Sequence, residues 1–334
     1  MHVSKKFRAL ILGAATLLTA GLLAGCGADQ SAGSSGAKSH KVGIVQLVEH
    51  NALDAANKGF VDGLKERGFE EGKNIEFDRQ NAQADQSNLQ NIAQRFVSAK
   101  LDLICAIATP AAQTIANATK DIPIVGTAIT DYEGAKLVAS NKEPGRNVTG
   151  TSDMNPINEQ VDLLIKLCPN AKTIGTIYCS SEVNSEVQVK KMTEYAESKG
   201  LTVKIATIST VNDLQQAAQS LVNDVDAFYE PTDNIVASAM PTLIAITDAA
   251  KKPVICAEEN MVKAGGLATY GIDYYKLGVQ TGHMAADILE GKNKPASMSI
   301  ELAKDLKLTI NKKNADLLGI TLPDDLLKQA DVIE

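Results

Sequence analysis

The sequence contains no tryptophan, and aromatic residues make up only 4% of its 334 positions. It has four histidines and five cysteines, and these show no CxxC or Cys/His spacing of the kind that binds a metal. The motifs GxSxG, GxxxxGK[ST] and HExxH are absent, and no GxGxxG follows the first expected strand. We therefore expect a protein without enzymatic activity, cofactor or metal site.

A long hydrophobic run without charges, LILGAATLLTAGLLAG, lies near the start of the chain. Lys5, Lys6 and Arg8 precede it, and small residues lead from it to Cys26, an order typical of an export signal. The letters LLAGC resemble the bacterial lipobox, in which cleavage leaves the cysteine at the new N-terminus with diacylglycerol attached. We expect residues 1–25 to be a lipoprotein signal peptide and Cys26 the lipidation site. A single N-terminal membrane anchor is the alternative.

The segment 26–40 is rich in Gly, Ser and Ala, which predicts a flexible tether. The folded part begins near Lys41 and has about 290 residues, a usual size for two domains. Without the three cations of the signal peptide, 30 basic residues stand against 40 acidic ones. This acidic balance disfavours binding to nucleic acid or to anionic lipid.

Four cysteines remain when Cys26 is lipidated. Cys105, Cys179 and Cys256 lie inside apolar runs of strand length, where cysteine behaves as a small hydrophobic residue. Cys168 has no partner at a motif spacing. We therefore expect buried free thiols, with a disulfide as the alternative.

Apolar runs of strand length alternate with helical patterns along the folded part, beginning with KVGIVQLV, NIEFDRQN, LDLICAIA and PIVGTAI. This alternation predicts parallel sheets covered by helices on both faces. The order then repeats: the apolar helix face from Leu89 to Val97 returns from Leu214 to Val222, at a constant offset of 125 residues. The sequence therefore predicts an α/β fold of two similar Rossmann-like lobes.

The boundaries of these lobes follow from the Pro- and Gly-rich segments between the runs. We expect the N-terminal lobe to comprise residues 41–148 and 268–296, and the C-terminal lobe residues 149–267 and 297–334. The chain would then cross between the lobes three times, and three crossings form a hinge.

Two corresponding segments follow the third expected strand of each lobe, ATPAAQT at 108–114 and EPTDNIV at 230–236. In open parallel sheets, ligands bind at the carboxyl ends of the strands, where helix N-termini direct free N–H groups into the crevice. Polar loops at 48–57 and 179–188 follow the first strand of each lobe. Two such edges facing each other would enclose a cleft. Helix caps and solvated loops are the alternative interpretation of these residues.

Six motifs occur in one order after the lipobox: VEHNALDAANKGF, IATPAAQ, NVTGTSD, YCSSEVNSE, YEPTDN and TYGIDYYKLG. Together they resemble the ABC transporter substrate-binding lipoproteins of the tryptophan and tyrosine type, which have a type I periplasmic-binding fold. The resemblance covers nearly all of the chain from Lys41 onward. Asn51 stands in EHNALDA where the family often has proline. Proline restricts the backbone and asparagine does not, so this loop is expected to be less rigid than in the family.

The resemblance implies an extracytoplasmic solute-binding lipoprotein of an ABC importer. Its expected ligand is a small solute, in particular an aromatic amino acid such as tryptophan, tyrosine or phenylalanine, held between two closing lobes. The expected partners are an ABC permease with its ATPase subunit and the cell membrane, contacted through the lipid anchor, and the protein would be a monomer. Two alternatives stay open: a surface sensor that passes its closed state to a receptor, or a binding protein for a sugar or nucleoside.

An amino acid needs hydrogen-bond donors for its carboxylate and an acid for its ammonium group. Hydroxyl groups of Thr109, Ser180, Ser181 and Ser185 are the expected donors. Asp131, Glu182 and Asp233 are the candidate acids, with a helix cap as the alternative role of Asp233. The expected ligand-binding residues are His50, Leu53, Thr109, Asp131, Ser180, Ser181, Glu182, Asn184, Ser185, Asp233 and Asn234.

Overall fold

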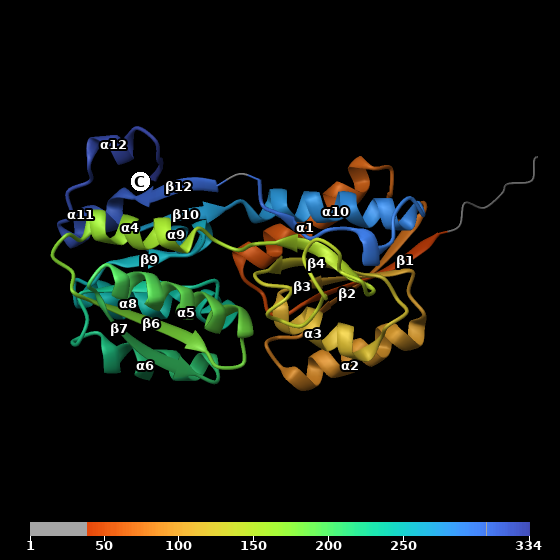
Figure 1. Cartoon of the computed structure of the whole chain (residues 1–334), viewed down its shortest axis with the longest axis horizontal. Coiled ribbons are helices and arrows are strands. Elements are labelled where there is room, and N and C mark those ends of the chain that lie inside the picture. The colour runs from red at the N-terminus through yellow and green to blue at the C-terminus, as the bar shows by residue number, and fades with distance from the viewer. Residues whose placement is uncertain (1–38, 305) are drawn as a thin grey trace, which may run out of the picture. The chain divides into compact units, whose positions relative to one another are not determined.

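The computed structural model describes residues 39–304 and 306–334 (Figure 1). The expected signal peptide and Cys26 lie outside these residues. The described part contains two sheets, one of six and one of seven strands, each with helices on both faces. None of its helices is both long enough and apolar enough to cross a membrane.

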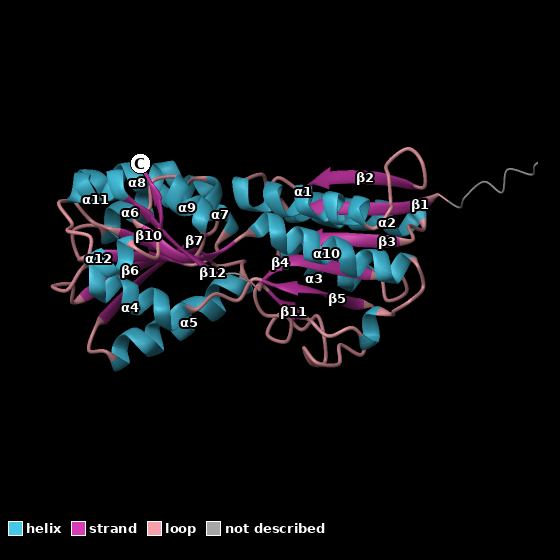
Figure 2. Ribbon diagram, turned by 90° about the horizontal axis from the view of Figure 1, so that it is seen from above, coloured by secondary structure: helices cyan, strands magenta, loops and turns pink. Residues whose placement is uncertain are grey.

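The first sheet is entirely parallel and has the strand order β11-β5-β4-β3-β1-β2 (Figure 2). Its strands are β1 (His40–Gln46), β2 (Ile75–Asn81), β3 (Leu103–Ile107), β4 (Ile124–Ile129), β5 (Val148–Ser152) and β11 (Glu301–Leu302). Helices α1 (Asn51–Glu66) and α10 (Tyr274–Leu289) cover one face, and α2 (Gln86–Ala99) and α3 (Thr109–Ala118) cover the other. Strands β3, β4 and β5 are buried along their whole length, as their apolar runs require.

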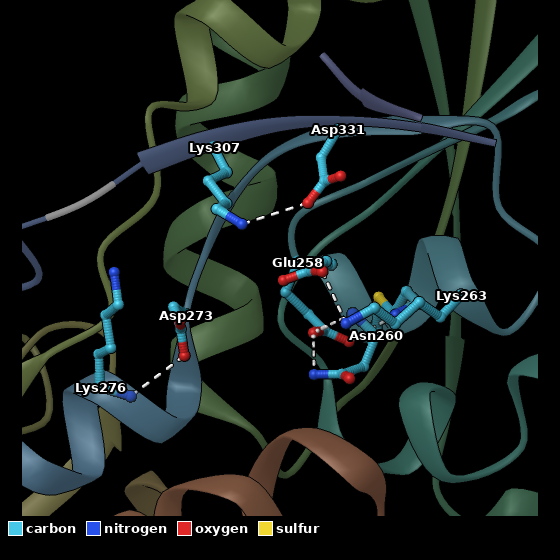
Figure 3. Close-up of polar contacts among 9 residues, drawn as sticks. Glu258, Asn260, Lys263, Asp273, Lys276, Lys307 and Asp331 are labelled. Carbon is cyan, nitrogen blue, oxygen red and sulfur yellow. Dashed lines mark hydrogen bonds and ion pairs between the residues drawn. The ribbon is translucent and has the colours of Figure 1, made fainter. Parts of the chain in front are cut away.

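The second sheet has the order β13-β12-β10-β9-β8-β6-β7, and only the β10–β12 pair is antiparallel. Its strands are β6 (Thr173–Cys179), β7 (Thr202–Ile208), β8 (Ala227–Glu230), β9 (Val254–Cys256), β10 (Ala268–Ile272), β12 (Leu306–Asn311) and β13 (Asp331–Ile333). An ion pair of 3.2 Å between Lys307 and Asp331 joins the two last strands (Figure 3). This pair lies on the surface and adds little to stability.

The helices of the second lobe pack against two apolar clusters, one on each face of the sheet. One face carries α6 (Leu214–Leu221), α7 (Asn234–Ser238), α8 (Met240–Ala249) and α9 (Glu259–Lys263). The other carries α4 (Ile157–Leu167), α5 (Val183–Ser198) and α12 (Asp324–Leu327), while α11 (Lys312–Leu318) is hydrogen-bonded to α8 through Asn314 and Asp248. Short 3-10 turns, η1 (Val211–Asp213) and η2 (Pro295–Ser297), precede α6 and β11.

The predicted repeat is present in both lobes. Helix α2 buries Leu89 and Phe96, and its counterpart α6 buries Leu214 and Leu221. The counterpart of α3 is divided into the short helices α7 and α8. Because α7 starts at the strand end after β8, it directs its N-terminus toward the same edge as α3 does in the first lobe.

Helices α1 and α10 pack with their backbones in contact, and glycine makes this possible. A Cβ atom at Gly278 would lie 2.1 Å from the carbonyl oxygen of Ala56, and one at Gly59 would lie 2.1 Å from the carbonyl oxygen of Tyr275. No side chain fits at these distances. Helix α10 thus completes the first lobe, although it begins more than 200 residues after the end of α1.

Sheet membership shifts the expected lobe boundaries by one strand each. Strand β5 pairs with β4 in the first sheet, β10 pairs with β9 in the second, and β11 returns to the first. The chain crosses between the lobes at residues 153–156, at 273 and after 302. The segment with NVTGTS was expected to be a short strand in a crossing between the lobes, but it pairs in parallel with β4 and β11 and is a buried strand of the first sheet.

The four cysteines of the described part are free, as expected. Cys105, Cys179 and Cys256 are buried, and Cys168 is half-buried. Burial raises the pKa of the Cys105 and Cys256 thiols, which keeps them protonated.

Candidate functional site

A small pocket lies where the carboxyl ends of the strands of both sheets meet. His50, Leu53 and Ala128 line it from the first lobe, and Asp153 and Tyr274 line it from the crossings. The second lobe contributes Thr232, Asp233, Asn234, Ala237, Glu258 and Met261. The cavity measures about 10 Å³, which is roughly the room that one water molecule needs. Ligand pockets usually measure about 300–1,000 Å³, so a solute requires movement of the lobes.

Hydrogen bonds join the two lobes at this edge. His50 Nε2 lies 3.2 Å from Asn234 Oδ1, and the hydroxyls of Thr130 and Thr232 lie 3.4 Å apart. The amide of Gln188 donates to both hydroxyls. Each bond contributes on the order of 1 kcal/mol, so together they hold the lobes only weakly.

Asp153 connects two of the three crossings. It lies in the first crossing, and its Oδ2 accepts a hydrogen bond of 2.6 Å from the hydroxyl of Tyr274, the first residue of α10 after the second crossing. Its Oδ1 accepts from Thr130 at 2.9 Å. Burial raises the pKa of Asp153, while the bonds from Tyr274 and Thr130 oppose this shift.

Glu182 organises the second lobe's side of the pocket. Its carboxyl accepts the backbone N–H groups of Asn234 at 3.0 Å and Ile235 at 3.1 Å, and thereby caps α7 from another loop. The side-chain amides of Asn184 and Asn234 donate to it as well. Burial and the neighbouring Asp233 raise the pKa of Glu182 to about 8.

Asp233 is the N-cap residue of α7, because its Oδ1 accepts the backbone N–H of Val236 at 2.9 Å. Its Oδ2 accepts from the Cys179 N–H and the Ser185 hydroxyl, both at 2.7 Å. These bonds show the capping role directly. The residue also lines the pocket, and burial raises its pKa.

Glu258 is a second buried cap that lines the pocket (Figure 3). Its carboxyl accepts the backbone N–H groups of Asn260 and Met261, both at 2.7 Å, at the start of α9. Burial raises the pKa of Glu258 to about 7, and the bonds from Asn260 and Met261 oppose the shift. Acidic groups thus surround a site where desolvation disfavours their negative charge.

The backbone is strained near the carboxyl ends of β3 and β4 in the first lobe. Ala108, after β3, has φ +83°, and Ala128, within β4, has φ +55°, in the region that favours glycine. Thr109 follows Ala108, and its hydroxyl is buried without a hydrogen-bond partner among the described residues. Strain of this kind costs on the order of 1–3 kcal/mol and gathers at ligand sites.

The structure brings together many of the residues expected from sequence. His50, Leu53, Asp233 and Asn234 line the pocket. Glu182, Asn184 and Ser185 lie behind them, bonded to Asp233, Asn234 or Thr232. Thr109 is buried at the start of α3 but does not line this pocket.

Three expected residues lie elsewhere. Ser180 and Ser181 are exposed on the turn after β6, and Ser181 lines a separate groove beside Pro110 and Gln113 of α3. The carboxyl of Asp131 accepts the N–H of Gly134 in a local turn, while its neighbour Thr130 contacts the second lobe. The irregular register near the end of β4 explains this exchange, because it changes which side chain is directed across the cleft.

Sequence reasoning missed Thr130, Asp153, Gln188 and Glu258. Glu258 follows β9, so the strand-end rule that found Asp233 also points to it. Asp153 occurs in the motif NVTGTSD, which was assigned to a hinge crossing rather than to ligand contact. Gln188 lies one turn inside α5, where only the fold shows which face meets the cleft.

We predict that the ligand-free protein loses stability as the pH rises from about 5 to 8. The pKa values of Glu258, about 7, and Glu182, about 8, exceed the value of 4.5 for a free glutamate, so the folded state retains protons that the unfolded chain releases. Its melting temperature should therefore fall across this window, and Glu258→Gln should make the decline shallower. Rising stability across the window would contradict these assignments.

Comparison with known proteins places the chain among binding proteins. A family model described as "ABC transporter substrate binding protein" matches residues 41–333. The tyrosine-binding protein of Clostridioides difficile (strain R20291) is 46% identical over 302 residues, which cover 88% of this chain and 86% of that protein. The predicted fold is confirmed, because solved type I periplasmic-binding proteins share the two-lobed architecture.

Two solved structures of nearly equal identity differ in their similarity to this chain. An ABC domain from Streptococcus pneumonia in complex with L-Trp has a TM-score of 0.86 at 43% identity, covering 89% of this chain and 100% of that one. The ligand-free, open structure of a substrate binding protein with adhesive properties from Clostridium difficile has a TM-score of 0.68 at 45% identity, covering 88% and 99%. The two identities are nearly equal, and the hydrogen bonds between the lobes of this chain agree with a closed arrangement. The family match, the fold and the cleft at the strand ends agree, and the chain belongs to the ABC transporter substrate-binding proteins, a family of binding proteins rather than enzymes.

Proposed function

We propose that this protein is the extracytoplasmic solute-binding lipoprotein of an ABC importer and that it holds one aromatic amino acid between its lobes. The observation that carries the proposal is a set of buried polar atoms, in segments that follow strand ends of the two lobes, that lack partners among the described residues. They are the hydroxyl of Thr109, Nδ1 of His50 and Oδ1 of Asn184. Buried polar groups are almost always hydrogen-bonded, so such atoms are suited to a ligand.

The carboxylate of the amino acid would bind at the start of α3. The free hydroxyl of Thr109 lies in the first turn of this ten-residue helix, whose N-terminal N–H groups favour negative charge. The strained Ala108 immediately before it gives the helix its entry direction. A hydroxyl and helix N–H groups together match a carboxylate, which accepts several hydrogen bonds.

The ammonium group would lie near the acids that line the pocket, Asp153, Asp233 and Glu258. No ion pair joins these carboxyls to a lysine or arginine in the part of the chain that the structure describes. Burial raises the pKa of all three, and a cation from the ligand would offset this unfavourable desolvation. Asp131 is no longer favoured for this role, since its carboxyl serves a local turn.

Aromatic specificity is inferred from relatives together with the apolar surface of the pocket. One relative is named a tyrosine-binding protein and another was solved with L-Trp. Leu53, Met261 and the ring of Tyr274 supply apolar contact here. The lobes would open at the hinge, admit the solute and close on it, because a ligand that touches both lobes favours the closed state.

Transport requires partners beyond the described residues. The closed form would be presented by a monomer to an ABC permease driven by its ATPase subunit. The lipid on Cys26, diacylglycerol with palmitate as a typical chain, would hold the protein at the extracytoplasmic face of the cell membrane. The Gly- and Ser-rich tether would let the folded body reach the permease.

We predict that the soluble body, from about Lys41, binds tryptophan, tyrosine or phenylalanine at micromolar or tighter affinity, which corresponds to roughly 8 kcal/mol or more. A ligand at about 100 times its dissociation constant should stabilise the fold by about 2.7 kcal/mol. A thermal-shift survey of amino acids, sugars and nucleosides measures this. Stabilisation by a sugar or nucleoside alone would overturn the ligand class.

We predict that Thr109→Val lowers amino-acid affinity by roughly ten- to more than a hundredfold, the usual effect of losing a hydrogen bond to a charged group. The ligand-free melting temperature should not fall, because this hydroxyl has no partner to lose among the described residues. Thr176→Val is a matched control, since Thr176 is also buried and unpartnered but lies in the middle of β6 rather than at a strand end. Titration calorimetry measures the amino-acid affinity of both variants. Equal affinities of Thr109→Val and Thr176→Val would exclude Thr109 as a group that binds the ligand's carboxylate.

We predict that Cys26→Ser releases the folded body from the membrane without unfolding it. Fractionation of cells and mass spectrometry of the native N-terminus give the measurement. An unmodified chain that starts at another residue would rule out the lipid anchor while leaving the ligand proposal intact.

A further inference from the structure

The orientation of the Asn234 side chain is fixed by its neighbours in the second lobe. Glu182 accepts hydrogen bonds from two backbone N–H groups at the start of α7 and from the Asn184 amide. The Nδ2 of Asn234 contacts Glu182 Oε2, the oxygen that also accepts a hydrogen bond from Asn184 Nδ2. The Oδ1 of Asn234 therefore faces His50 across the cleft.

This orientation determines the state of the His50 ring. An amide oxygen only accepts hydrogen bonds, so His50 Nε2, 3.2 Å from Asn234 Oδ1, must carry a proton. Burial lowers the pKa of His50, against the opposing effects of the Asn234 hydrogen bond and of Asp54, so the ring is neutral near pH 7. Its single proton then resides on Nε2, and Nδ1 is a bare acceptor. Nδ1 is buried and has no partner among the described residues.

From this geometry we infer that His50 selects its ligand by accepting a hydrogen bond at Nδ1 from an N–H or O–H group of the bound amino acid. The inference rests on the proposed function and adds a direction to it: the ligand must donate at this point. Two donors have this chemistry, the ammonium group that every amino acid carries and the side-chain donor of tyrosine or tryptophan. Phenylalanine has only the first.

The same bonds connect recognition to closure of the lobes. His50 lies at the start of α1 in the first lobe, whereas Asn234 and Glu182 belong to the second. Nε2 finds its amide partner only when the lobes meet, so the acceptor at Nδ1 is fixed in the closed form alone. Glu182 and Asn234 are positioning residues that act through His50.

Two substitutions separate the nitrogens of the ring. In His50→Gln the longer amide reaches the position of Nε2 and keeps the bond to Asn234, but it leaves no acceptor at Nδ1. In His50→Asn the shorter amide places an oxygen near Nδ1 and loses the bond to Asn234. His283→Gln is the matched control, because His283 contacts Glu66 at the surface, away from the cleft.

We expect His50→Gln to weaken binding about tenfold or more, His50→Asn to weaken it less, and His283→Gln to leave it unchanged. Calorimetry with three ligands identifies the donor. An equal loss for phenylalanine, tyrosine and tryptophan assigns Nδ1 to the ammonium group, and a loss for tyrosine and tryptophan alone assigns it to the side chain. A greater loss in His50→Asn than in His50→Gln would overturn the inference, because it would show that only the Asn234 bond matters.

Nitrogen NMR of the wild-type His50 ring tests the same point without a substitution. The ligand-bound protein should show a protonated Nε2 and a bare Nδ1 whose resonance shifts toward that of a hydrogen-bonded acceptor. A protonated Nδ1, or an Nδ1 resonance that the ligand leaves unchanged, would refute the assignment. Failure of the wild-type protein to bind any aromatic amino acid would instead refute the proposed function, so the two outcomes are distinct.

Discussion

The burial of the Glu182 carboxyl determines the arrangement of the second lobe's side of the cleft. A carboxyl removed from water needs several donors, and the start of α7 together with two asparagine amides supplies them. Helix α7 is only five residues long, so it depends on this external cap for its position. The placement of Asp233 and Asn234, and through Asn234 the contact with His50, follows from it.

The two lobes meet through few and long hydrogen bonds, and this sets the energy scale of the hinge. Bonds of 3.2–3.4 Å between neutral groups contribute on the order of 1 kcal/mol each. Open and closed forms can thus lie close in free energy, and a ligand that bridges the lobes is able to decide between them. In this arrangement a hydrogen bond between Asp153 and Tyr274 joins two of the crossings.

The sequence was sufficient for what depends on local periodicity. The faces of α2 and α6, the repeat of 125 residues and the position of EPTDN at a strand end all follow from spacing. The sequence did not predict which side chain at a strand end is directed into the cleft. Asp131 was expected there, yet the irregular end of β4 directs Thr130 toward the second lobe. The lobe boundaries failed at β5 and β10 because pairing between distant strands leaves no local signal. The positive φ angles of Ala108 and Ala128 likewise leave no signal in the sequence, because such angles are expected at glycine rather than at alanine.

The glycine contact between α1 and α10 affects the order in which the chain can fold. The first lobe consists of the beginning of the sequence together with α10 and β11, so its core stays incomplete until nearly the whole chain has been made. Contacts between segments so far apart also form slowly, because a long loop must close first. A chain emerging from the ribosome therefore cannot complete its first domain ahead of the second. For a protein that must cross a membrane before it folds, such a delay keeps the polypeptide extended and threadable.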